Sequence, residues 1–327
     1  MSNYDVYGLG NALVDIEYEI DDAFLEANGI AKGQMTLVEA ADQDAVMAKL
    51  PHLTPRRGSG GSAANSLIAV SGFGGRAYYS CKVADDELGR FFVKDMLAAG
   101  VDTNADQHHG DGDSGRCLVL LTPDAERTMN TSLGISGSLS RANINEDALR
   151  AARFLYMEGY LCTSETARAA LIEAHAMARD AGVTVAATLS DPSMPEFFGS
   201  ELREMLGDHV DHLFCNEEEA LLFTDSDSLD AAAAALKDFA GSFSITRGPL
   251  GALVWDGEST FEHPAPDVRA VDTLGAGDLF AGAYLYSLSR GEGHAGAAAL
   301  ACRAAGELVT HFGPRLPTER LKALLDA

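Results

Sequence analysis

The chain has 327 residues, 46% hydrophobic and 22% charged, a balance that is typical of a globular protein and excludes disorder as its main state. Its 49 acidic residues against 24 Lys and Arg give a formal net charge of −25, which disfavours nucleic acid as a partner because phosphate backbones are bound by clustered cations. Five cysteines without a CxxC pair, no N-terminal signal pattern and no apolar run of about 18 residues predict a cytoplasmic protein with reduced thiols and no membrane partner.

Hydrophobic periodicity and turn residues predict strands and helices that alternate along most of the chain. The predicted strands cover residues 5–10, 14–20, 34–38, 77–83, 116–121, 127–131, 154–158, 183–189, 212–215, 243–246 and 252–255. The predicted helices cover residues 21–29, 41–50, 62–73, 87–99, 166–181, 217–223, 229–239, 276–289, 294–311 and 317–325. This alternation predicts an α/β fold in which helices cover both faces of a mostly parallel sheet.

The early strands differ from the later ones because they carry polar side chains at alternate positions. Residues 14–20 alternate apolar with acidic side chains, and residues 54–61 look like a flexible segment. We therefore expect one catalytic domain over residues 1–327, with a small β-sheet lid inserted from about residues 15–40 and 104–122.

The most informative motif is DTLGAGD, which ends at Asp278 and precedes an apolar helix. Its glycines let the backbone wrap closely around an anion, and the helix N-terminus offers the unpaired N–H groups of Gly275, Ala276 and Gly277. Asp278 lies in the first helical turn, where it could accept the proton of a hydroxyl aimed at a bound phosphoryl group. A glycine turn with a capping aspartate is the structural alternative, but the flanking DT makes the full motif rare by chance.

A second glycine-rich stretch, GGSAANS, starts another predicted helix. Together the two stretches resemble the two signatures of the ribokinase-like carbohydrate and nucleoside kinases, the PfkB family. The resemblance implies a three-layer αβα sandwich with a mostly parallel central sheet and a β-sheet lid, and transfer of the γ-phosphoryl group of ATP with Asp278 as the base. It also implies that the first stretch holds the acceptor's hydroxyls through Gly60, Gly61, Ser62 and Asn65.

Within this family the chain most resembles the adenosine kinases, through segments such as GNALVD and RTMN. The resemblance implies acceptor contacts at Asn11, Asp15, Arg127 and Tyr160. A carboxylate at residue 15 suits a vicinal diol because its two oxygens accept two charge-strengthened O–H bonds. A dinucleotide-binding GxGxxG is disfavoured because Leu13 stands where its third glycine is needed.

The ATP side of the site is also implied by the family resemblance. The expected ATP-binding residues are Asn216, Thr246, Arg247, Gly248, Gly251, Asp272, Thr273, His311 and Gly313. Glu219 completes an NxxE motif and is expected to hold Mg²⁺ through water, although acidic residues in a first helical turn are also ordinary dipole partners. A monovalent cation such as K⁺ would be sought near the loop at Asp272.

The expected function is therefore phosphorylation of a primary hydroxyl of a nucleoside or sugar, foremost adenosine to AMP. A sugar kinase of the same fold, acting on ribose or fructose, is the first alternative. A catalytically silent nucleoside-binding protein is the second, and the intact DTLGAGD motif argues against it. The lid could close over its own site or pair with a neighbour's, so both a monomer and a lid-mediated homodimer are expected possibilities.

Overall fold

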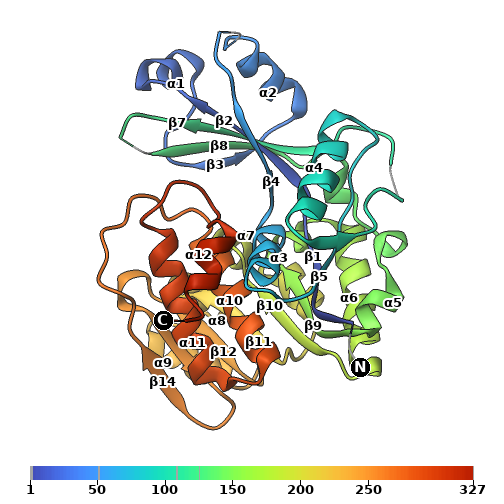
Figure 1. Cartoon of the computed structure of the whole chain (residues 1–327), viewed down its shortest axis with the longest axis vertical. Helices are drawn as coiled ribbons and strands as arrows, with labels where there is room; N and C mark the ends of the chain where they lie inside the picture. The colour runs from blue at the N-terminus through green and yellow to red at the C-terminus, as the bar shows by residue number, and fades with distance from the viewer. Residues whose placement is uncertain (1–2, 51, 108–109, 125, 327) are drawn as a thin grey trace.

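The computed structural model describes residues 3–50, 52–107, 110–124 and 126–326, and within these residues it contains a large and a small β-sheet (Figure 1). The large sheet has the spatial order β14 (Thr260–His263), β13 (Ala252–Trp255), β12 (Phe243–Thr246), β11 (His212–Asn216), β10 (Thr184–Thr188), β9 (Ala152–Glu158), β1 (Tyr4–Leu9), β5 (Ala77–Ser80) and β6 (Val101–Thr103). Neighbouring strands from β12 to β6 are parallel, whereas β13 runs antiparallel to both of its neighbours, β12 and the edge strand β14.

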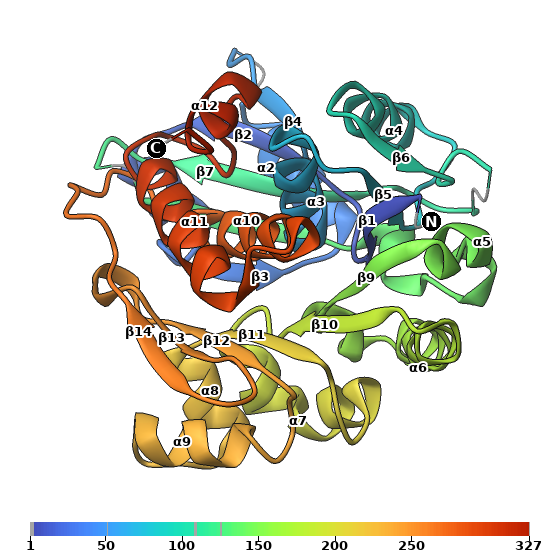
Figure 2. The ribbon, with the colours of Figure 1, turned by 60° about the horizontal axis from the view of Figure 1, so that its bottom comes forward.

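Helices cover the large sheet on both faces (Figure 2). One face packs against α3 (Ser62–Gly72), α4 (Glu87–Ala98), α10 (Ala276–Arg290), α11 (Gly293–Leu308) and α12 (Thr318–Ala323). The other packs against α5 (Glu146–Arg150), α6 (Glu165–Ala181), α7 (Ser193–Leu206), α8 (Glu217–Thr224) and α9 (Leu229–Leu236). Successive side chains of a strand alternate between the two cores: on β1, Val6 joins one core, whereas Tyr7 and Leu9 join the other.

The small sheet has the order β3 (Met35–Leu37), β8 (Arg127–Ser132), β7 (Gly115–Leu121), β2 (Leu13–Glu19) and β4 (Arg56–Gly60). The short helices α1 (Asp22–Asn28) and α2 (Ala40–Met47) lie on its outer side (Figure 1). Its buried residues, among them Ile16, Leu118 and Leu120, pack with Leu25 of α1. The inner side of the small sheet faces the large sheet.

The predicted three-layer α/β architecture with a small second sheet is confirmed. The strands of the small sheet fall within residues 13–60 and 115–132, so the sheet extends beyond the expected segment 15–40 and begins and ends later than the expected segment 104–122. Of the expected segment, residues 108–109 lie outside the described part of the chain. The segment expected to be flexible contains β4, since residues 56–60 pair antiparallel with β2.

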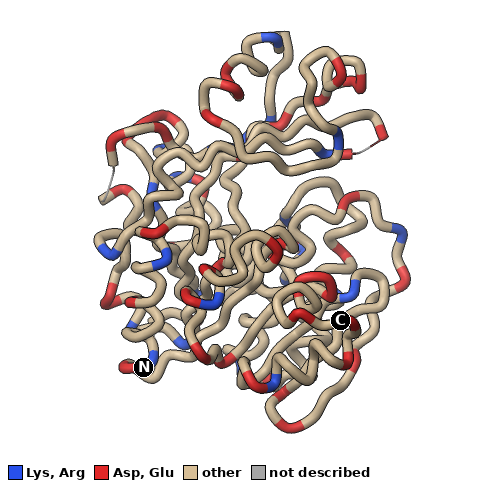
Figure 3. Tube along the Cα trace, turned by 180° about the vertical axis from the view of Figure 1, so that it is seen from behind, with Lys and Arg blue, Asp and Glu red and all other residues tan. Residues whose placement is uncertain are grey.

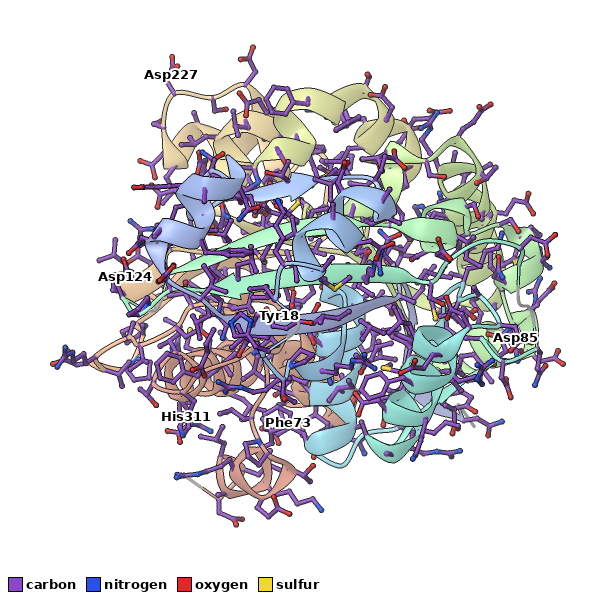
Figure 4. All side chains as sticks on the ribbon, turned by 90° about the horizontal axis from the view of Figure 1, so that it is seen from above. Tyr18, Phe73, Asp85, Asp124, Asp227 and His311 are labelled. Atoms are coloured by element: carbon purple, nitrogen blue, oxygen red, sulfur yellow. The ribbon has the colours of Figure 1, made fainter. Side chains whose placement is uncertain are left out.

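Acidic residues occur along the chain in all parts of the fold, including the small sheet (Figure 3). Asp85, Asp124 and Asp227 are exposed and lie at widely separated points of the periphery (Figure 4). The large negative charge is therefore distributed over the surface and does not mark a single site. In the part of the chain that the structure describes, no helix has both the length and the apolar character required to cross a bilayer.

Candidate active site

A cavity of about 630 Å³ lies between the small sheet and the carboxyl ends of strands β9 to β12. Clefts at this edge of a parallel α/β sheet are the usual ligand sites of such folds. The predicted site residues that line it are Asn11, Asp15, Gly61, Ser62, Asn65, Tyr160, Asn216, Glu219, Thr246, Thr273, Gly275, Ala276, Gly277 and Asp278. The predicted site residues outside its lining are Gly60, Arg127, Arg247, Gly248, Gly251, Asp272, His311 and Gly313.

Asp278 lies in the first turn of α10 and is held by two side chains of α3. Ser62 Oγ donates to its Oδ1 over 2.7 Å, and Asn65 Nδ2 donates to its Oδ2 over 2.9 Å. Burial raises the pKa of Asp278, while these two hydrogen bonds and the positive charge of Arg315 act in the opposite direction. The carboxylate is thus oriented within the cavity and made more basic than an ordinary aspartate.

Close packing of α3 against α10 brings these three side chains together. A Cβ atom on Gly282 of α10 would lie 2.4 Å from the carbonyl oxygen of Ser66 in α3, so only glycine allows this separation. The helices meet just beyond the turn that carries Asp278. The two glycine-rich motifs are therefore joined in space by a third glycine that sequence analysis did not single out.

The N-terminus of α10 is open to the cavity. Its N-cap is Gly275, in the left-handed region at φ 74°, and a Cβ there would lie 2.6 Å from the carbonyl oxygen of Pro314. Among the described residues, no side chain caps this helix end. The N–H groups at the start of a helix are good donors to an anion, and Gly275, Ala276 and Gly277 all line the cavity. The N–H of Ala276, expected to be unpaired, donates to the carbonyl oxygen of Thr273 over 3.2 Å, so an anion would have to share it. This end of the cavity can receive a phosphoryl group.

Asp15 faces the same cavity from β2. Gly60 of β4 lies beside it, and a Cβ at residue 60 would come within 2.3 Å of Oδ1 of Asp15, so the glycine leaves room for this carboxylate. Burial raises the pKa of Asp15 to about 6, against the opposing charges of Arg315 and Arg127. Gly60, although outside the cavity lining, thus leaves space for a carboxylate that lines the cavity.

Glu158, at the end of β9, is a cavity residue that sequence analysis did not identify. Its side chain is fully buried and accepts from the backbone N of Asn11 over 2.7 Å, from Asn11 Nδ2 over 3.0 Å and from the backbone N of Ala63 over 3.0 Å. It therefore joins the β1–β2 turn to the N-terminus of α3. Burial raises its pKa to about 7 despite these hydrogen bonds. The sequence signal that could have identified Glu158 is a carboxylate at the end of the predicted apolar strand 154–158, directly before Gly159.

The small sheet supplies an apolar wall to the cavity. Register pairs Val119 with Met129 and Met129 with Met35, so these side chains share the inner face. The apolar cavity residues from this region are Leu13, Met35, Leu37, Val119, Met129 and Leu133. Met35 is 36% exposed and Leu37 is 53% exposed, which leaves apolar surface available to a ligand. Tyr160 lines the cavity as well, so the wall could hold a flat, partly apolar group.

Asn216 and Glu219 form a capping box at the start of α8. Asn216 Oδ1 accepts from the N of Glu219 over 2.8 Å, and Asn216 Nδ2 donates to Oε1 of Glu219 over 2.6 Å. Burial, with a contribution from nearby Asp191, raises the pKa of Glu219 to about 7. A buried carboxylate at the cavity whose negative charge is poorly compensated can bind a hydrated Mg²⁺. Within the described residues no group of three or more His, Cys, Asp or Glu side chains could hold a metal ion, so such an ion would need phosphate ligands as well.

Arg127 connects the small sheet to the DTLGAGD loop. Its Nη2 lies 2.8 Å from Oδ2 of Asp272, and its Nη1 lies 2.7 Å from Oε2 of Glu17. Asp272 also accepts from the backbone N of Gly313 and of Leu274, which fixes the loop before α10. In this structure Arg127 therefore holds the loop that carries the helix N-terminus.

The other expected ATP-side residues lie beyond the lining of the cavity. Arg247 pairs with Glu217 and Glu262, in each case over 2.9 Å, so its charge is partly compensated. Gly248 opens a short 3₁₀ helix at residues 248–250, and a Cβ on Gly251 would lie 2.0 Å from the carbonyl oxygen of His263. His311 bonds locally, with its Nδ1 3.0 Å from the carbonyl oxygen of Glu307.

Comparison with known proteins gives one family match and several relatives along nearly the whole chain. The family model described as pfkB family carbohydrate kinase matches residues 26–321. The adenosine kinase of Saccharomyces cerevisiae is 25% identical over 334 residues, which cover 96% of this chain and 97% of the yeast protein.

Two solved structures are similar in both fold and sequence. The structure described as adenosine kinase from Sinorhizobium meliloti has a TM-score of 0.88 and 34% identity, covering 99% of this chain and 99% of that one. The structure described as a probable sugar kinase protein from Rhizobium etli has a TM-score of 0.90 and 32% identity, covering 100% of this chain and 98% of that one. The similarity therefore includes the small sheet as well as the large one.

Proposed function

This chain belongs to the pfkB family of carbohydrate kinases, and from that premise we propose that it transfers the γ-phosphoryl group of ATP to the 5′-hydroxyl of adenosine. The observation that carries the proposal is Asp278, held by Ser62 and Asn65 next to the uncapped N-terminus of α10. A base and an anion-binding helix end within one turn are the two devices that phosphoryl transfer to a hydroxyl requires.

The proposed mechanism divides the work between these two devices. Asp278 accepts the proton of the acceptor hydroxyl, and its raised pKa favours this transfer. The N–H groups of Gly275, Ala276 and Gly277 stabilise the negative charge on the transferred phosphoryl group. Mg²⁺, when bound near Glu219, would neutralise phosphate charge in a chain that has few cations to offer.

A nucleoside fits the acceptor side because the cavity combines polar and apolar walls. Asp15 and Asn11 can accept and donate hydrogen bonds to ribose hydroxyls at one end. The inner face of the small sheet, with Met35 and Leu37 exposed, offers apolar surface to a base. The relatives described as adenosine kinases support the same acceptor.

A sugar kinase is the second candidate. The similar structure from Rhizobium etli is described as a probable sugar kinase protein, and a sugar would use the polar end of the cavity alone. The apolar wall would then have no partner, which is why we favour the nucleoside.

The proposal also includes activation by K⁺, residence in the cytoplasm and the oligomeric state. Activation by K⁺ and residence in the cytoplasm follow from the family resemblance and from the sequence. The chain acts as a monomer or as a homodimer paired through the small sheet, where β3 is an edge strand.

The test is ADP release from Mg-ATP with adenosine, inosine, ribose and fructose as acceptors. Adenosine is expected to be the preferred acceptor, and Asp278→Asn is expected to lower kcat by about 10²- to 10⁴-fold. Asp85→Asn, at an exposed position far out on the periphery, is the matched control and should keep wild-type turnover. Turnover of fructose or ribose but not of adenosine would show that the acceptor is a sugar. Full activity of Asp278→Asn would overturn the proposed mechanism.

A further inference from the structure

We propose that Arg315 is a positioning residue for phosphoryl transfer, which orients Asn65 toward Asp278 and places a cation beside both active-site aspartates. The inference rests on the proposed function. Arg315 lies in the loop between α11 and α12, outside both glycine-rich motifs and outside the lining of the cavity.

The orientation of Asn65 follows from the donors and acceptors around it. Arg315 Nε donates to Oδ1 of Asn65 over 2.9 Å, and Asn65 Nδ2 donates to Oδ2 of Asp278 over 2.9 Å. A guanidinium can only donate and an ionised carboxylate can only accept, so the amide has one orientation that satisfies both partners. Without Arg315 the amide oxygen has no fixed donor, and the amide is free to turn its oxygen toward Asp278.

Arg315 is itself held by several contacts across three elements. Its Nη2 donates to the backbone oxygen of Ser59 and lies 3.1 Å from Ser59 Oγ, and its Nη1 lies 3.3 Å from Oδ2 of Asp95. These contacts join β4 and α4 to Asn65 of α3. The planar fork of a guanidinium makes all of them at once, whereas a lysine ammonium presents a single point of charge.

The cation lies among many acidic groups. Burial raises the pKa of Asp278 and of Asp15, and the charge of Arg315 lowers the pKa of both. Other titratable groups that interact with Asp278, from the elements packed around it, are Asp15 on β2, Tyr79 on β5, Tyr156 and Glu158 on β9 and Tyr160 in the 3₁₀ helix after β9. All of these are neutral or negative, so Arg315 supplies positive charge that they cannot.

The kinetic test compares Arg315→Met and Arg315→Lys with the wild type. Arg315→Met is expected to lower kcat for adenosine by about 10- to 100-fold and to move the acid limb of the kcat–pH profile upward, because Asp278 loses a cation. Arg315→Lys keeps the charge, so its acid limb should stay near that of the wild type while kcat falls. Arg90→Met removes an equal charge at an exposed position away from the cavity and serves as the control with near wild-type kcat.

A substrate-free measurement separates this inference from the proposed function. NMR of protein carrying ¹³C-labelled aspartate carboxyls identifies the Asp278 signal by its loss in Asp278→Asn. The signal should titrate at higher pH in Arg315→Met than in the wild type, whether or not adenosine is the acceptor. Identical titration in the two proteins overturns the inference. Absence of wild-type turnover with adenosine, together with a shifted titration, would overturn only the proposed function.

Discussion

Replacing Gly282 by alanine should slow catalysis from a position that touches no substrate. The new Cβ would lie 2.4 Å from the carbonyl oxygen of Ser66 and 2.8 Å from the Cβ of Ala69, whereas ordinary contacts begin at 3.4 Å. Both atoms belong to the α3 helix, so α3 and α10 must separate by about 1 Å to admit the methyl group. The hydrogen bonds from Ser62 and Asn65 to Asp278, at 2.7 Å and 2.9 Å, span the same two helices.

A displacement of about 1 Å at a reacting group typically lowers the rate by about 10²-fold, so we expect a fall in kcat of this size for Gly282→Ala. The overpacked interface should also lower the free energy of unfolding by about 1–3 kcal/mol. The assay is steady-state ADP release with saturating adenosine, beside urea unfolding of the same protein.

The matched control is Gly199→Ala in α7. Among the described residues, no atom lies within 4 Å of a Cβ at this position, so the extra methyl group meets nothing. This variant should keep its kcat and its stability, although Gly199 directly follows the kink of α7 at Phe198, because the methyl group has open space around it. A Gly282→Ala protein with reduced stability and wild-type kcat would refute the argument that helix spacing positions Asp278.

Two further predictions concern buried charges. Burial raises the pKa of Glu158 to about 7 from its ordinary 4.5, so the folded protein retains a proton that the unfolded chain has lost, and the free energy of unfolding falls as the pH rises from about 4.5 to about 7. In Glu158→Gln the free energy of unfolding should fall by up to about 3 kcal/mol less across this pH range, as measured by urea unfolding. An unchanged pH dependence would contradict the raised pKa of Glu158. Arg127→Met leaves Glu17 and Asp272 without their shared cation and should lower the free energy of unfolding by about 3–5 kcal/mol. Arg127→Met combined with Asp272→Asn should lose less, and an equal or greater loss would show that the ion pair is not the cause.

The features that sequence analysis predicted are those whose signals are local. Apolar periodicity after the two glycine-rich motifs predicted where α3 and α10 begin. It thereby predicted that Ser62, Asn65 and Asp278 lie near the starts of these helices. The helix α7 was not predicted because Pro195 and Gly199 interrupt its pattern, yet its apolar side chains bury one face.

The features that it missed depend on partners far along the chain. Arg315 contacts residues more than 200 positions earlier, and nothing in the surrounding GPRLP indicates this. The strand β4, at residues 56–60, has a sequence typical of a loop and becomes a strand because β2 pairs with it. The pairing of Arg127 with Asp272 was also not predicted, since strand order and sheet position decide which loop Arg127 can reach.

Two of the connections that join the small sheet to the rest of the chain pass through residues proposed to contact the acceptor. Between β1 and β2 the chain passes through Asn11, and between β4 and α3 it passes through Gly61, whose φ is 104°. If the small sheet moves relative to the large one, the backbone at Asn11 and Gly61 must change with it, and these are two of the residues proposed to bind the acceptor. Inserted residues should thus be tolerated in the outer turns around α1 and α2, whereas a single insertion beside Asn11 or Gly61 should displace both the small sheet and the proposed acceptor contacts.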